Sequence, residues 1–84
     1  GSKYEWGWRV MMPISEIRIG DVYKNPLHSY GVEFVVVDIN HEEKMIEVQP
    51  VSSQSRDVEA IGKPFWKSNR DRMFSEGWRV LRGR

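Results

Sequence analysis

The stretch from Val32 to Ile39 constrains the fold of this chain more than any other segment, because apolar residues occupy both faces of one extended strand. Val35, Val37 and Ile39 share one face, and Val32, Phe34 and Val36 share the other. A short polar connection over residues 40–43 separates this strand from residues 44–51, where apolar and polar side chains alternate. The pattern predicts a β-hairpin whose first strand is central and buried on much of both sides.

Shorter segments on either side of the hairpin predict further strands. Residues 17–24 are expected to be extended, with Ile17 and Ile19, and Val22 as a further candidate, on one side. Residues 62–67 predict a strand with Phe65 and Trp66 on opposite faces, and residues 78–82 predict a final strand.

One short helical segment is expected before the last strand. Residues 69–76 have the composition of a short helix or 3₁₀ turn, which Gly77 would end. Met73 and Phe74 are expected to point inward, whereas Arg70 and Arg72 would remain in solvent.

Length and composition exclude several classes of protein. A chain of 84 residues builds one small core, which rules out a two-domain enzyme, and the absence of cysteine rules out disulfides, a thiolate nucleophile and cysteine-based metal sites. No apolar run is long enough to span a membrane, and we expect a cytoplasmic protein. Gly1 and Ser2 are typical of residues left after removal of a tag. Residues 1–12 are interpreted as an extension or extra strand and residues 13–84 as the domain.

Three segments carry a resemblance to a known group of small barrels: residues 17–23 (IRIGDVY), 30–39 (YGVEFVVVDI) and 45–48 (MIEV). Together they resemble the KOW and Tudor-like members of the SH3-like barrels. The resemblance implies an all-β SH3-like barrel of about five strands with one helical turn before the last, and it implies RNA binding as a function. Similar small barrels are also encoded by phages and prophages, which the resemblance suggests as a source.

The net charge of +1 hides an uneven distribution along the chain. Residues 31–60 carry seven acidic side chains against two basic ones, and residues 61–84 carry seven basic against two acidic. In the last third, aromatic and cationic side chains interleave, a pattern that suits phosphate contacts and base stacking on single-stranded nucleic acid. The residues predicted to bind RNA or single-stranded DNA are Lys63, Trp66, Lys67, Arg70, Arg72, Arg79 and Arg82.

Two other interpretations of the same residues stay open: the aromatic residues of this region fill the core while its arginines cover an outer face, or the region contacts an acidic protein surface. Four tryptophans are many for so small a core, and surplus aromatic residues and methionines are enriched at the centres of protein interfaces. The alternative function is therefore a protein-interaction module, as one repeat of a larger protein or alone. Its predicted surface comprises Trp6, Trp8, Met11, Tyr23 and Tyr30.

The sequence does not favour catalysis. His28 and His41 fall in predicted loops with no nucleophile or orienting group nearby in a recognisable pattern. The run His41-Glu42-Glu43 lacks a second cluster that could complete a metal shell, and no glycine-rich phosphate loop is present. We expect a non-catalytic binding module without metal, cofactor or small-molecule substrate.

Overall fold

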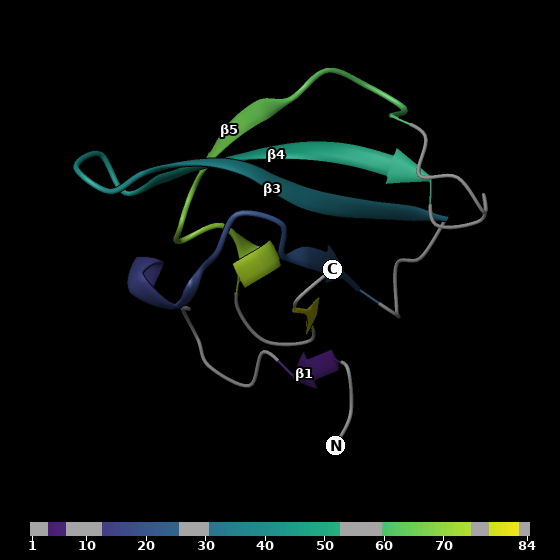
Figure 1. Cartoon of the computed structure of the whole chain (residues 1–84), viewed down its shortest axis with the longest axis horizontal. Helices are drawn as coiled ribbons and strands as arrows, with labels where there is room; N and C mark the ends of the chain where they lie inside the picture. The colour runs from purple at the N-terminus through teal and green to yellow at the C-terminus, as the bar shows by residue number, and fades with distance from the viewer. Residues whose placement is uncertain (1–3, 7–12, 26–30, 53–59, 75–77, 83–84) are drawn as a thin grey trace.

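The computed structural model describes residues 4–6, 13–25, 31–52, 60–74 and 78–82, and within these ranges the chain is mainly β (Figure 1). The elements are β1 (Tyr4–Trp6), η1 (Ile14–Glu16), β2 (Val22–Lys24), β3 (Val32–Asn40), β4 (Met45–Ser52), β5 (Phe65–Ser68), η2 (Arg72–Phe74) and β6 (Arg79–Leu81), where η denotes a 3₁₀ turn. All strands pair antiparallel in one sheet with the order β1-β6-β2-β3-β4-β5. The prediction of an all-β chain is confirmed at this level, and no helix of the described residues could cross a membrane.

The predicted hairpin is formed by β3 and β4, the two longest strands. Its turn covers residues 41–44 between the paired residues Asn40 and Met45. Asn40 Oδ1 accepts a hydrogen bond of 3.0 Å from the Glu43 backbone N–H, and Lys44 takes a left-handed φ of 54° to return the chain to the strand. These local contacts set the register of the hairpin next to the turn.

An irregularity in β3 changes which side chains face the core. Val36 pairs with Val48 and Ile39 pairs with Ile46, so the register shifts by one residue between Val36 and Asp38. The extra residue, Val37, is 38% exposed. The expectation that Val37 and Ile39 share one buried face is therefore wrong, because a β-bulge breaks the period of two.

The turn before β2 separates Ile17 from Ile19, and the expectation that these two side chains face one side is wrong. Ile17 is 3% exposed and Ile19 is 64% exposed. The backbone N–H of Asp21 donates to the carbonyl oxygen of Arg18 at 3.0 Å, and Gly20 adopts a φ of 93°, which is the geometry of a type II turn. Ile19 lies at the tip of this turn and projects into solvent.

The core lies against one face of the sheet, where η2 contacts β2. The rings of Tyr23 and Phe74 meet edge to face with centroids 4.9 Å apart, and Met73 is 1% exposed, so the predicted inward orientation of Met73 and Phe74 is confirmed. Asp71 positions η2, because its Oδ1 accepts a hydrogen bond from the Met73 N–H at 3.1 Å. The buried cluster comprises Ile17, Tyr23, Val36, Ile46, Val48, Met73, Phe74 and Val80.

Candidate functional site

Strand β5 divides the predicted aromatic and basic residues between two faces of the sheet. Phe65 and Lys67 pair with the core-facing Val48 and Ile46, whereas Trp66 pairs with Glu47 on the opposite face. The prediction that Phe65 and Trp66 lie on opposite faces is confirmed. Both rings are accessible, at 38% for Phe65 and 43% for Trp66, but they cannot contact the same bound strand from one side.

Phe65 forms an exposed ring on rigid support. Its ring packs edge to face on Phe34 with centroids 6.2 Å apart. The ring centroids of Phe34 and Trp78 are in turn 6.1 Å apart. The ammonium of Lys67 lies 5.4 Å from the centroid of the Phe65 ring and 2.9 Å from Asp71 Oδ2. Because these neighbours restrain the Phe65 ring, its side chain loses little conformational entropy when a planar group stacks on it.

Trp66 lies in a different electrostatic setting. Trp66 pairs with Glu47 of β4, and Glu47 pairs with Asp38 of β3, so one carboxylate stands beside the indole and a second lies one strand further along this face. A polyanion would be repelled from this face. The structure thus separates Trp66 from the cationic part of its predicted site.

The basic residues of the last third also divide between two places. Lys63, before β5 in the chain, and Arg70, after it, are exposed. Arg82, after β6, is half-buried, where its Nη2 donates to the Glu16 carbonyl oxygen at 2.6 Å and its Nη1 lies 3.9 Å from Asp21 Oδ2. Arg82 therefore supports the fold beside the buried Asp21. Arg79 is half-buried in β6, and the side chain of Arg72 lies outside the described residues.

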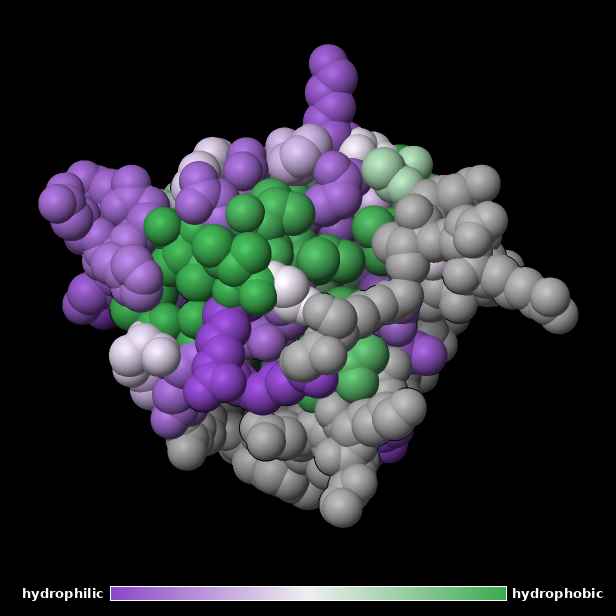
Figure 2. Space-filling view, in the orientation of Figure 1, coloured by the Kyte–Doolittle hydropathy of each residue, from purple (hydrophilic) through white to green (hydrophobic). Residues whose placement is uncertain are grey.

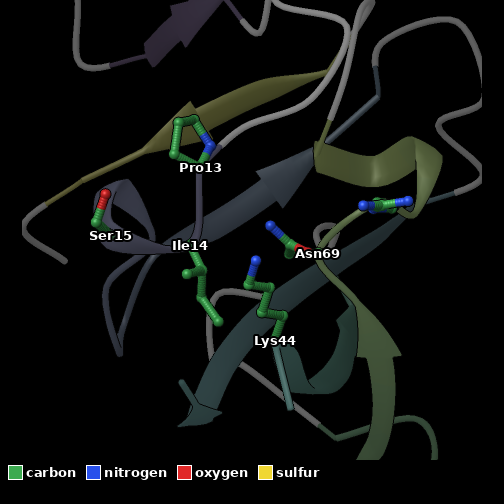
Figure 3. A pocket seen from close by; sticks show the side chains of 6 residues that line it. Pro13, Ile14, Ser15, Lys44 and Asn69 are labelled. Atoms are coloured by element: carbon green, nitrogen blue, oxygen red, sulfur yellow. The ribbon is translucent and has the colours of Figure 1, made fainter. Parts of the chain in front are cut away.

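Lys44 lies next to the turn after β5, although its position in the sequence does not suggest this. The Asn69 N–H donates to the Lys44 carbonyl oxygen at 3.1 Å, which brings the hairpin turn beside the residues that follow β5. Lys44, Asn69 and Arg70 line a hollow of about 420 Å³ together with Pro13, Ile14 and Ser15 (Figure 3). Lys44 belongs to the acidic third of the sequence, which gives no sign that it lies near Arg70. Only the strand pairing shows this.

The prediction that Tyr23 belongs to an exposed interaction surface is wrong. Tyr23 is fully buried, because β2 presents it to the core where Phe74 covers it. Trp8, Met11 and Tyr30, and the side chain of Trp6, lie outside the described residues. The described residues instead expose Ile19 and Val37, and Figure 2 shows a continuous apolar area on the face in view.

Burial of Tyr23 has a consequence for stability at alkaline pH. Desolvation, followed by the nearby charge of Asp21, raises the pKa of the Tyr23 phenol well above its usual value near 10. An unfolded chain releases this proton above about pH 10, whereas the folded chain retains it, so the free energy of unfolding falls as pH rises through this range. In urea denaturation at a series of pH values, the free energy of unfolding should fall more steeply with pH for wild type than for Tyr23→Phe, by up to about 1.4 kcal/mol per pH unit. Equal slopes for the two proteins above pH 10 would contradict this assignment.

Metal binding finds no support among the residues that the structure describes, since no three histidine, aspartate or glutamate side chains come together there. His41 is exposed in the hairpin turn.

The geometry defines the chain as a mainly β domain with an exposed aromatic and cationic strand at one edge of its sheet. Comparison of the chain with family models, with curated proteins and with solved structures finds no match.

Proposed function

We propose that this chain is an SH3-like barrel that acts as a non-catalytic binding module in the cytoplasm. The order β6-β2-β3-β4-β5 supports a five-stranded barrel in which the last strand lies beside the first, with β1 added at the edge. The turn η2 precedes the last strand, as the barrel layout requires, and fills the interior with Met73 and Phe74. Phe34 of β3 contacts both Phe65 of β5 and Trp78 next to β6, so rings from the two outer strands of this set pack on one central side chain.

The proposed ligand is single-stranded nucleic acid, bound along β5 and the turn that follows it. The observation that carries this proposal is the supported, exposed ring of Phe65 on the same strand as Lys67, with Arg70 directly beyond. Stacking on an aromatic ring requires an unpaired base, and cations beside the ring neutralise the phosphates. Trp66, on the acidic face, and Arg82, beside Asp21, do not belong to this proposed surface.

A salt titration tests the proposal. Binding of a fluorescent eight-nucleotide RNA or DNA strand should weaken steeply with salt. Lys63→Gln combined with Arg70→Gln should reduce the slope of log K against log[salt] by about 0.7 for each phosphate that the variant no longer neutralises. The measurement is fluorescence anisotropy at salt concentrations from about 50 to 200 mM, the range over which phosphate contacts weaken most visibly.

Arg18→Gln is the matched control. It removes one positive charge, against two in the double variant, from an exposed site in the turn before β2, and the salt slope should not change. Absence of binding to both strands at low salt would reject the nucleic-acid proposal. A protein-interaction module would then be the leading function, favoured by the exposed Ile19 (64%) and Val37 (38%) and by the apolar area that Figure 2 shows.

A further inference from the structure

The hollow beside the hairpin turn combines two kinds of lining. Figure 3 shows Lys44 and Asn69 directed into the same space, with Ile14 and Pro13 around it. The lining thus combines the Lys44 ammonium and the Arg70 guanidinium with the apolar side chains of Pro13 and Ile14. Its volume of about 420 Å³ lies in the range of small-molecule sites.

The two cations of the hollow are available to a ligand. Within the described part of the chain, the side chains of Lys44 and Arg70 form no ion pair. Asp71, next to Arg70, is held by Lys67 at 2.9 Å, and Glu43, next to Lys44, is exposed in the hairpin turn. Two cations in one concavity repel each other, and an anion placed between them relieves this repulsion.

Hydrogen bonds hold the backbone that carries these two cations. The Asn69 N–H donates to the Lys44 carbonyl oxygen, the Arg70 N–H donates to Ser68 Oγ at 3.2 Å, and the Asp71 N–H donates to the Ser68 carbonyl oxygen at 2.9 Å. Asn69 itself is only 6% exposed. The hollow is therefore preorganised by the hairpin turn and by the turn after β5.

We propose that this hollow is a phosphate-binding site that takes one phosphorylated nucleotide, with the phosphate between Lys44 and Arg70 and the sugar or base against Ile14. The inference rests on the proposed binding of single strands, which it deepens: Asn69 of the hollow follows Phe65 by four residues, a distance of roughly 13 Å in an extended chain. The nucleotide is the terminal residue of a bound strand or a free mononucleotide, and the two sources share this chemistry.

The experiment compares eight-nucleotide strands with a 5′-phosphate, a 3′-phosphate or no terminal phosphate, by fluorescence anisotropy at about 50 mM salt, where charge contacts are strong. Wild type should bind one phosphorylated form about tenfold more tightly than the unphosphorylated strand, which corresponds to one charge-assisted contact. Lys44→Gln should reduce this ratio to about one. The control Lys63→Gln removes an equal charge before β5, outside the hollow, and should keep the ratio.

The outcomes separate the inference from the proposed function. If all strands bind wild type with equal affinity, the hollow is not a phosphate site, while strand binding by β5 stands. If no strand binds, the proposed function fails, and titration of the ¹⁵N-labelled protein with adenosine monophosphate decides the inference alone. Shifts of the Lys44 and Asn69 amide signals that are absent in Lys44→Gln would support the hollow as a free mononucleotide site, and unchanged signals would overturn it.

Discussion

Substitution of Phe74 by alanine is expected to destabilise the domain by about 3–5 kcal/mol, the cost of emptying a buried aromatic site. Phe74 is 2% exposed, and the centroids of the Phe74 and Tyr23 rings are 4.9 Å apart, so truncation removes a buried ring and its contact with Tyr23. The total stability of a domain is about 5–15 kcal/mol, so the variant should lose a large fraction of it and unfold at a lower urea concentration. Urea denaturation followed by circular dichroism measures the change.

Val37→Ala provides the comparison for this prediction. Val37 is also apolar but is 38% exposed at the β3 bulge, and its truncation should cost less than about 1 kcal/mol. Similar destabilisation of the two variants would mean that η2 does not fill the core as described.

Substitution of Phe65 by alanine is expected to weaken binding of single-stranded nucleic acid by about tenfold, within the roughly 1–3 kcal/mol that one stacked base contributes. The variant should remain folded, because Phe65 is 38% exposed and Phe34 retains its contact with Trp78. Anisotropy with the same eight-nucleotide strands measures affinity, and thermal denaturation verifies the fold.

Trp66→Ala is the matched control for Phe65→Ala. Trp66 is exposed to a similar extent on the neighbouring residue of β5, but it stands beside Glu47 and Asp38 on the other face. Its removal should leave affinity within about twofold, since acidic neighbours exclude phosphates from that face. A greater reduction of affinity in Trp66→Ala than in Phe65→Ala would place the binding surface on the acidic face and contradict the proposal.

Much of the sheet could be predicted from the sequence because its strongest signals are periodic. The β3–β4 hairpin, the strand around Phe65 and the inward orientation of Met73 and Phe74 all follow from alternation and composition. The exposure of Ile19 and Val37 could not be predicted in the same way. Both depend on a single break in periodicity, a type II turn or a bulge, which leaves no apolar pattern in the sequence.

The candidate site could be predicted less completely, because it depends on strand pairing across the sheet. Alternation along the strand already predicts that Phe65 and Trp66 lie on opposite faces, whereas the approach of Lys44 to Arg70 depends on the β4–β5 pairing. Charge counting cannot distinguish an arginine that supports a buried carboxylate, as Arg82 does with Asp21, from one that faces solvent. The register decides between these roles.

The register shift in β3 also bears on how this domain tolerates changes in chain length. Val37 is the one residue by which β3 exceeds a regular alternation, since Val36 and Ile39 occupy consecutive core positions opposite Val48 and Ile46. A sequence with one residue fewer at this point would keep the same side chains inside and outside, and only the local bend and extra twist of the strand would disappear. The bend of the longest strand is thus encoded by a single insertion, at a site where a deletion preserves the hydrophobic pattern.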